Sequence, residues 1–294
     1  MDVKTIMVVG AGQMGSGIAQ VCAVAGYQVF LYDISEAQLD KGIANIEKGL
    51  ARQVEKGKMT AADKDAALAR LARSTDLHAA AKADLVIEAV VENMDVKTKL
   101  FAELDALARP ETILASNTSS LPITEIAAAT KRPEKVIGMH FMNPVPVMKL
   151  VEIIRGLATA DDVYETIEAV ARKLGKVPVE VNDFPGFISN RVLMPMINEA
   201  IYALYEGVAT KEAISDVKDR TWIMERNSEQ TAEAAQHVAT AMAEISKGTM
   251  EQTTEAEKTS KLMADLASLI DDTINKAGAV EKITSSTRSL SVHT

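Results

Sequence analysis

Residues 8–15 read Val8-Val9-Gly10-Ala11-Gly12-Gln13-Met14-Gly15, an apolar strand end that leads through a glycine-rich turn directly into a helical pattern. Gly10 allows the tight turn, Gly12 lets the backbone approach a pyrophosphate, and Gly15 lets the helix pack close to the strand. The following helix presents free N–H groups and a positive dipole end to phosphates. This stretch predicts a doubly wound, Rossmann-type α/β domain that binds a dinucleotide. The alternative is a glycine-rich turn that serves chain geometry alone.

A carboxylate ends the second strand-like run, Val29-Phe30-Leu31-Tyr32-Asp33. At that position a carboxylate accepts hydrogen bonds from the adenosine ribose hydroxyls and repels a 2′-phosphate. We therefore expect NAD as the cofactor and disfavour NADP. Gln13 and Met14, which lie between the glycines of the turn, belong to the same expected cofactor site.

Short apolar runs alternate with helical patterns through the first part of the chain, which predicts a parallel sheet with helices on both faces. We expect the dinucleotide-binding domain to span residues 1–183. The predicted strands are 5–9, 28–32, 84–87, 112–115, 136–139 and 177–181, and the predicted helices are 14–25, 36–56, 96–108 and 162–174.

The C-terminal part of the chain has a different pattern. An apolar helix is predicted over 187–205, broken or kinked at Pro195, within a shortened helical domain over 184–214. Residues 228–284 keep a heptad spacing with many Thr, Gln and Ala residues in the seam, which predicts a long coiled-coil-like helix. Residues 285–294 are predicted to be a frayed tail.

Composition excludes several classes of protein. The net charge of −9 argues against general affinity for nucleic acid or anionic lipid, and no apolar run approaches the roughly 20 residues that span a bilayer. The single cysteine, Cys22, lies in an apolar run where buried packing is expected, and it suits a reducing compartment. Without a basic leader before the first strand, we predict a cytoplasmic protein. No histidine has metal-ligand spacing, so no metal is expected.

A histidine and a glutamate form the expected catalytic pair. His140 follows a buried strand at the edge where open α/β sheets bind ligands. Pro144 and Pro146 turn the chain back, so that Glu152 on the returning run can reach one imidazole nitrogen. Such a carboxylate fixes the tautomer and raises the basicity of the other nitrogen, as the oxidation of a secondary alcohol by hydride transfer requires. The alternative is a histidine with satisfied hydrogen bonds at a domain edge.

Further polar residues follow strand ends at the same edge. The run Ser116-Asn117-Thr118-Ser119-Ser120 offers hydroxyls and an amide to a substrate oxygen and the cofactor, while Ser120 is also a candidate N-cap for a helix at 122–128. Glu92 and Lys97 are expected on the same rim, although Lys97 is equally a candidate for a solvated helix charge.

Lys56 and Lys58, on either side of Gly57, form a small basic loop. This loop is suited to the phosphates of a bulky substrate. The alternative is a solvated helix end, which the sequence alone favours somewhat.

Residues 1–214 resemble the 3-hydroxyacyl-CoA dehydrogenase family. The resemblance depends on five motifs together: Gly10–Gly15, Val91-Glu92-Asn93, Ser116–Ser120, His140-Phe141-Met142-Asn143-Pro144, and Pro185-Gly186-Phe187 through Asn190-Arg191.

The resemblance implies roles for individual residues. His140 is implied to be the acid/base, Glu152 its orienting carboxylate, and Ser119 a contact of the substrate oxygen and the cofactor. Lys56 is implied as a contact of coenzyme A. The implied reaction interconverts (S)-3-hydroxybutanoyl-CoA and acetoacetyl-CoA with NAD(P). The residues implied to line the nicotinamide side are Glu92, Lys97 and Asn143.

Beyond Ile214 the residues do not follow the family pattern. Residues 229–290 instead resemble, in composition, the signalling helix of methyl-accepting chemotaxis proteins. We therefore predict a chimeric chain whose dehydrogenase activity is impaired, and which forms homo-oligomers through its coiled-coil-like tail or its remaining helices. The alternative is a non-catalytic dinucleotide-binding head on a coiled-coil signalling or oligomerisation stalk.

Overall fold

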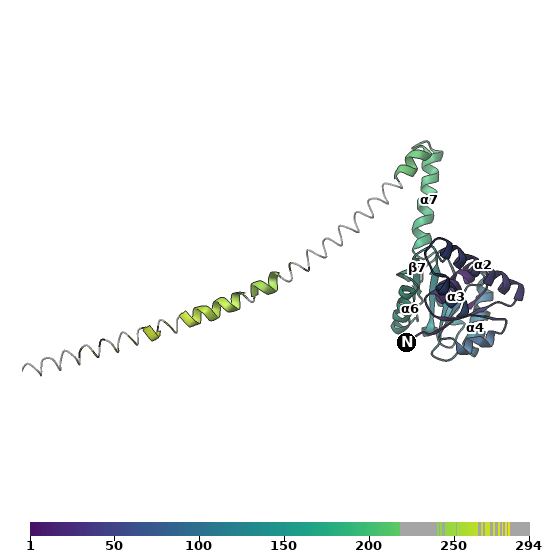
Figure 1. Cartoon of the computed structure of the whole chain (residues 1–294). Helices are drawn as coiled ribbons and strands as arrows, with labels where there is room; N and C mark the ends of the chain where they lie inside the picture. The colour runs from purple at the N-terminus through teal and green to yellow at the C-terminus, as the bar shows by residue number, and fades with distance from the viewer. Residues whose placement is uncertain are drawn as a thin grey trace, which may run out of the picture. The chain divides into compact units, whose positions relative to one another are not determined.

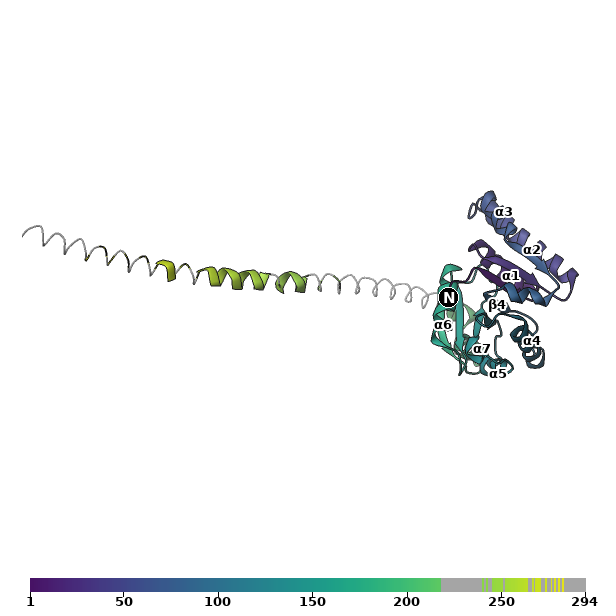
Figure 2. The ribbon, with the colours of Figure 1, turned by 90° about the horizontal axis from the view of Figure 1, so that it is seen from below.

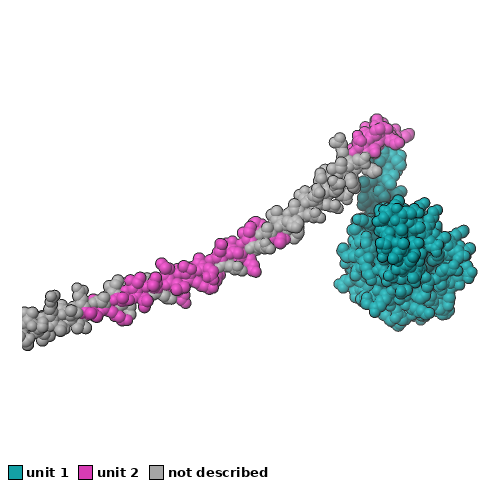
Figure 3. Space-filling view, in the orientation of Figure 1, with its two compact units in different colours: residues 1–201 teal, residues 202–294 magenta. Residues whose placement is uncertain are grey.

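The computed structural model describes residues 1–217 and a series of residues between 240 and 282. The chain divides into two compact units, residues 1–201 and 202–294, which Figure 3 colours separately. The domain boundary predicted at 183/184 lies within the first unit and stays a prediction. Beyond residue 217 the described residues are 240, 242, 245–250, 252–263, 266, 268–270, 273, 276, 278, 280 and 282.

The first unit, all of whose residues are described, is built on one eight-stranded sheet. Its strands are β1 (Thr5–Val9), β2 (Gln28–Tyr32), β3 (Leu71–Ser74), β4 (Leu85–Glu88), β5 (Ile113–Ser116), β6 (Val136–Phe141), β7 (Leu150–Arg155) and β8 (Val177–Asn182). The strand order is β3-β2-β1-β4-β5-β6-β7-β8. The order therefore reverses between β1 and β4, where doubly wound sheets bind ligands beyond the carboxyl ends of their strands.

Helices cover both faces of this sheet (Figure 1). The helices are α1 (Gln13–Val24), α2 (Glu36–Glu55), α3 (Ala61–Ala69), α4 (Met94–Leu107), α5 (Ile123–Ala128), α6 (Asp161–Lys173) and α7 (Ser189–Tyr205), with the 3-10 helices η1 (Leu77–Lys82) and η2 (Pro133–Lys135). Figure 2 shows α2 and α3 side by side at one edge of the unit, and the two helices are in contact.

Alternate residues of each central strand belong to two separate hydrophobic cores, one on each face of the sheet, because successive side chains of a strand point to opposite faces. In β1, Ile6 and Val8 belong to the core shared with α1, α2 and α6, whereas Met7 and Val9 belong to the core shared with α4 and α5. Burial on both faces explains why the central strands are almost wholly apolar.

The predicted α/β doubly wound class is confirmed. Each predicted strand and each of the four predicted helices in residues 1–183 is present, with ends within two residues of the prediction. The pattern missed β3, α3 and η1. β3 is a four-residue edge strand in which Ala72 and Arg73 are exposed, so it lacks the apolar run that marks the central strands.

The predicted parallel sheet contains one antiparallel pairing, at the place where Pro144 and Pro146 were predicted to turn the chain back. β7 runs antiparallel to β6, and β8 runs parallel to β7. A parallel connection needs a crossover of about a dozen or more residues, whereas β6 and β7 are joined by the short proline-containing loop 142–149. The reversal pairs His140 directly with Glu152 in the strand register.

Helix α7 differs from the other α-helices, α1 to α6, because none of its residues is buried. Pro195 lies inside it without dividing it, so the predicted break is wrong. Large apolar side chains are exposed along it, among them Leu193 at 50%, Met196 at 63% and Ile201 at 60%.

The described residues between 240 and 282 are helical. Heptad positions among them, such as Ile245, Met263 and Ile270, are more than half exposed. The coiled-coil seam therefore stays a prediction. Some positions of the predicted heptad seam lie outside the described residues, among them Val238, Ala277 and Thr284. The predicted frayed tail, residues 285–294, and the histidines His237 and His293 lie outside them as well.

Candidate active site

The glycine turn is shaped as the sequence predicts. Gly12 is the N-cap of α1, which begins immediately after the turn. Gly10 has φ 106°, in the region that favours glycine, and a Cβ on Gly15 would lie 1.7 Å from the Gly10 carbonyl oxygen. Around Gly12 the space is open, because no atom lies within 4 Å of the place of a Cβ. The turn thus leaves room at the N-terminus of α1 for a phosphate group.

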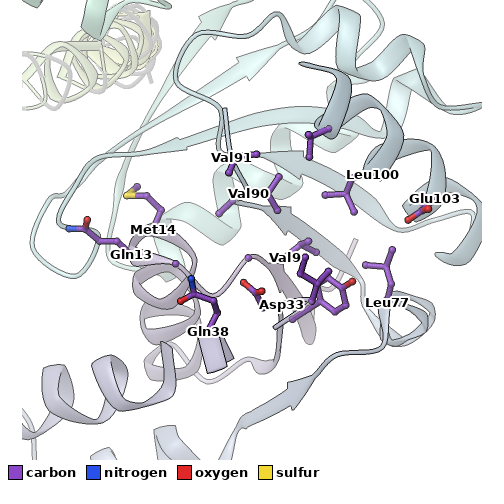
Figure 4. Close-up of a pocket in the computed structure, with 16 residues that line it drawn as sticks. Val9, Gln13, Met14, Asp33, Gln38, Leu77, Val90, Val91, Leu100 and Glu103 are labelled. Atoms are coloured by element: carbon purple, nitrogen blue, oxygen red, sulfur yellow. The ribbon is translucent and has the colours of Figure 1, made fainter. Parts of the chain in front are cut away.

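A cavity of about 610 Å³ opens beside this turn (Figure 4). Ligand pockets are commonly of this size. In Figure 4, Asp33 lies near the middle, Gln13 and Met14 lie toward one end, and Leu77 and Leu100 toward the other. A glycine turn, a carboxylate and an apolar end fit the pyrophosphate, ribose and adenine of NAD in that order.

Asp33 is fixed at the end of β2 by two backbone donors. Its Oδ2 accepts from the Ala11 N–H at 2.9 Å and its Oδ1 from the Ser35 N–H at 3.0 Å. A carboxylate has about four lone-pair positions, so capacity remains for ribose hydroxyls. The side chain is half-buried and lines the cavity.

His140 and Glu152 form a buried pair, as predicted. Their Nδ1 and Oε2 atoms are 2.8 Å apart, and the residues are 6% and 0% exposed. Burial opposes ionisation of Glu152, but hydrogen bonds from His140 and Ser189 outweigh it and hold the pKa of Glu152 below its usual value. An ionised carboxylate only accepts hydrogen bonds, so Nδ1 carries a proton and Nε2 is left as the reactive nitrogen.

The loop after His140 contacts the glycine turn. Asn143 accepts a hydrogen bond at its Oδ1 from the Gln13 side chain at 3.1 Å. On the other side, the Asn117 side chain accepts from the Phe141 N–H at 2.9 Å. These two bonds connect the cofactor turn, the histidine strand and the serine-rich run that follows β5.

Glu92 holds the serine-rich run in place. Its Oε1 accepts from the Thr118 hydroxyl at 2.5 Å and from the Ser119 N–H at 2.8 Å, and its Oε2 lies 3.4 Å from Lys97 Nζ. Burial would raise the pKa of Glu92, but the hydrogen bonds from Thr118 and Ser119 and the charge of Lys97 lower it below its usual value. Glu92, Lys97 and Ser119 are therefore brought together.

Glu88 is a residue of the site that the sequence analysis missed. It ends β4, is fully buried, and lies 2.6 Å from Lys97 Nζ. Its second oxygen accepts from the Ser116 hydroxyl at 2.6 Å, and the Val90 N–H donates to its Oε1 at 2.7 Å. A carboxylate that ends an apolar strand at the ligand edge was the available signal, as it was for Asp33.

Two alternatives from the sequence are wrong. Lys97 is not a solvated helix charge, since it is 1% exposed and paired with Glu88. Ser120 does not cap α5. Asp183 does so instead, by accepting from the N–H groups of Ile123 at 3.0 Å and Thr124 at 2.7 Å. A cap supplied by a residue so far along the chain cannot be found from local sequence.

Lys56 is the exposed C-cap of α2 and does not line the cavity beside the glycine turn. Lys58 lines a separate cavity of about 270 Å³ together with Arg70. The structure therefore does not bring these lysines together with the catalytic pair, and their role stays a prediction.

The remaining titratable residues have other surroundings. Cys22 is buried as predicted, and burial raises the pKa of its thiol to about 12. His78 is exposed and pairs with Asp76 at 2.8 Å. Within the described part of the chain, no group of three His, Cys, Asp or Glu residues is placed to hold a metal ion. Among the same residues, no helix has both the length and the apolar character to span a bilayer.

Two family models match the chain. The model of the 3-hydroxyacyl-CoA dehydrogenase NAD binding domain matches residues 5–184, and the model of the C-terminal domain of the same family matches residues 186–268. The second match runs past Ile214, where the sequence predicts that the family pattern stops. The predicted bounds of the shortened helical domain, 184–214, stay a prediction.

Similar proteins cover about three quarters of the chain. It is 60% identical over 217 residues to a probable 3-hydroxybutyryl-CoA dehydrogenase of Bacillus subtilis (strain 168), which is 74% of this chain and 76% of that protein. Identity with the 3-hydroxybutyryl-CoA dehydrogenase of Bradyrhizobium diazoefficiens is 54%, over 72% of each chain. The crystal structure of (S)-3-hydroxybutyryl-CoA dehydrogenase PaaH1 from Ralstonia eutropha matches with a TM-score of 0.70 at 50% identity, over 72% of this chain and 75% of that chain. With the family model covering residues 5–184, these matches show that the chain belongs to the 3-hydroxyacyl-CoA dehydrogenase family.

Proposed function

We propose that the chain is an NAD-dependent dehydrogenase that interconverts (S)-3-hydroxybutanoyl-CoA and acetoacetyl-CoA. The observation that carries the proposal is the buried His140–Glu152 pair, 2.8 Å apart on the adjacent strands β6 and β7, whose connecting loop is hydrogen-bonded to the glycine turn through Asn143 and Gln13. The names of the relatives at 54–60% identity support the choice of a short acyl-CoA as substrate.

His140 transfers the proton of the reaction. Because Nδ1 donates to Glu152, Nε2 accepts the hydroxyl proton when the alcohol is oxidised and returns it when the ketone is reduced. Bound NAD supplies the hydride acceptor, and NADH the hydride donor. Burial of Glu152 keeps the imidazole in one tautomer and one orientation.

Ser119, Glu92, Lys97 and Asn143 are proposed to complete the site with this pair. Ser119 offers its hydroxyl to the substrate oxygen, on a run whose backbone is held by Glu92. Lys97 and Asn143 line the nicotinamide side, the second through its contact with Gln13. Lys56, an exposed residue at the end of α2, is proposed as a contact of the coenzyme A phosphates.

Absorbance of NADH tests the proposal directly. The full chain mixed with NADH and acetoacetyl-CoA should consume NADH, and His140→Gln should lower kcat by about 10²- to 10⁴-fold, the usual contribution of a general acid/base. His78→Gln is the matched control, because that ring is exposed and pairs with Asp76 outside the catalytic pair. Unchanged turnover in His140→Gln would refute the assigned base.

The alternative function, a dinucleotide-binding head without turnover, is not favoured by the similarity to named dehydrogenases. It predicts that NADH fluorescence reports binding while absorbance stays constant with acetoacetyl-CoA. The assay above therefore separates the two functions.

Homo-oligomers are proposed to form through α7 and the heptad seam. Burying an apolar side chain contributes about 1.5–3 kcal/mol, and α7 exposes Leu193, Met196 and Ile201 among others. Sedimentation that reports a monomer at all concentrations would refute this association. A cytoplasmic location is proposed with it, to be checked by fractionation of the native cells.

The compositional similarity of residues 229–290 to a chemotaxis signalling helix stays a proposal, and so does the chimeric origin that we infer from it. The intact mass of the protein isolated from its native source decides the question, since a chain that is not made as written would differ in mass from 31.6 kDa.

A further inference from the structure

The carboxylate of Glu152 is held from two sides, and one of them is the start of α7. While Oε2 faces His140, Oε1 accepts from the backbone N–H groups of Ile188 at 3.1 Å and Ser189 at 2.7 Å. Glu152 is fully buried. Rotation of the carboxylate would therefore break hydrogen bonds where water cannot replace them, which is strongly unfavourable.

The residues around the start of α7 also contact the imidazole and the serine-rich run. Phe187 is 2% exposed, and its ring centroid lies 5.8 Å from that of His140 with an interplanar angle of 56°. Among the described residues it is the one non-glycine residue with a positive φ, 50°, a conformation that persists only where the surroundings hold it. The Asn190 side chain donates to the Ser119 carbonyl at 3.2 Å.

We propose that residues 187–189 are positioning residues of the active site. The first N–H groups of α7 fix the direction of the Glu152 carboxylate, and Phe187 forms the apolar wall of the His140 ring. Charge-assisted hydrogen bonds from a helix N-terminus hold a carboxylate strongly, because the dipole of the helix adds to them. The C-terminal part of the chain thereby sets the geometry of a pair that lies in the dinucleotide-binding fold. This inference rests on the proposed role of His140.

Proline at Ser189 removes the donor without removing the helix. Ser189 is the first residue of α7, where proline is well tolerated because its missing N–H has no partner within the helix. Ser189→Ala keeps the N–H and removes the hydroxyl, which also helps to lower the pKa of Glu152. The comparison of Ser189→Pro with Ser189→Ala therefore isolates the backbone donor.

The first measurement is steady-state kinetics of the full chain. We expect kcat of Ser189→Pro to be about 10- to 100-fold below that of Ser189→Ala, as for the loss of a hydrogen bond to a charged group. The KM for NADH should agree within about twofold, because the donor does not touch the cofactor turn. Equal kcat values for the two variants would overturn the proposal.

The second measurement needs no turnover, so it separates this inference from the proposed function. NMR titration follows the His140 ring, whose signal is identified by its absence in His140→Gln. We expect the midpoint in Ser189→Pro to lie about 0.5 pH unit or more above that in Ser189→Ala, because a carboxylate that loses a donor attracts the proton of the neighbouring imidazole more strongly. Superimposable curves would overturn the proposal even in an inactive protein.

Phe187 provides a second variant in case Ser189→Pro no longer binds NADH. We expect Phe187→Ala to lower kcat about tenfold or more and Phe187→Leu to restore part of it, since an apolar wall is what the ring requires. Phe184→Ala is the matched control, because Phe184 lies in the same segment and is 60% exposed. If Phe187→Ala matched Phe184→Ala, the assignment of Phe187 would be wrong.

Discussion

Two buried carboxylates at the same edge of the sheet, Glu88 and Glu152, are supported in different ways. Each is fully buried and each faces a basic group, Lys97 in one case and His140 in the other. All the partners of Glu88 come from β4, α4 and β5 and the turns that adjoin them. Glu152 depends on the start of α7, a helix with no buried residue of its own.

The difference separates two uses of a buried acid. The Glu88–Lys97 pair is a buried ion pair that connects strand β4 with helix α4. Such pairs are costly to break because the remaining charge stays buried. The Glu152–His140 pair contains an imidazole, whose two ring nitrogens can donate and accept a proton, so it suits acid–base chemistry. We therefore expect isosteric changes to affect stability at the first pair and turnover at the second.

The largest expected effect is that of Glu152→Gln on turnover. The amide would accept from Ser189 through its oxygen and present its NH₂ group to His140 Nδ1, which would place the ring proton on Nε2. We expect kcat to fall about 10³- to 10⁴-fold, as when the wrong tautomer is imposed on a serine-protease histidine. Glu180→Gln, on the exposed strand β8, is the control. A loss of less than about tenfold would remove the distinction between the two acids.

The next largest effect is on stability at the other acid. Lys97→Met leaves Glu88 buried without its cation, so we expect the free energy of unfolding in urea to fall by about 3–5 kcal/mol. Adding Glu88→Gln should recover part of this loss, because the uncompensated charge is then gone. Lys99→Met, an exposed position on the same helix, should change the free energy by less than about 0.5 kcal/mol. A small effect of Lys97→Met would contradict the fixed ion pair.

Asp33 extends the comparison to a half-buried acid whose partners are backbone groups. Removing its charge with Asp33→Asn should weaken repulsion of a 2′-phosphate while it keeps the acceptor for Ala11. We expect the ratio of kcat/KM for NADH over NADPH to fall about 10- to 100-fold. An unchanged ratio would show that another group selects the cofactor.

The smallest expected effect is on the free energy of unfolding at low pH. In the folded protein Glu92 has a pKa below its usual value of 4.5. Its ionised form therefore stabilises the fold at pH values above 4.5. This stabilisation is lost as the pH falls from 4.5 through the lower pKa of the folded state. Because the side chain is 39% exposed, we expect less than about 1 kcal/mol. Urea unfolding of the wild type and Glu92→Gln between about pH 6 and about pH 3 checks this. Parallel curves would contradict it.

Local sequence patterns were sufficient to predict much of the candidate site. The glycine turn, Asp33 and the His140–Glu152 pair follow from residue types at strand ends, because parallel strands bring their carboxyl ends to one edge. Glu88 and the burial of Lys97 were not found, since a lysine on an exposed helix and one paired inside a core have similar local sequences. The Asp183 cap of α5 and the contacts of α7 join residues that are distant in the chain.

The amino-acid sequence by itself determined the order of the central strands and of helices α1, α2, α4 and α6, the cofactor turn and the chemistry available at the ligand edge, because these depend on local periodicity and on residue type. The tertiary structure alone decided the parallel pairing of β8 with β7, the pairing of Glu88 with Lys97, and the attachment of α7 to Glu152. The physical reason is burial. A polar group removed from water takes whichever partner the fold brings within hydrogen-bonding distance, and that partner can come from any part of the chain.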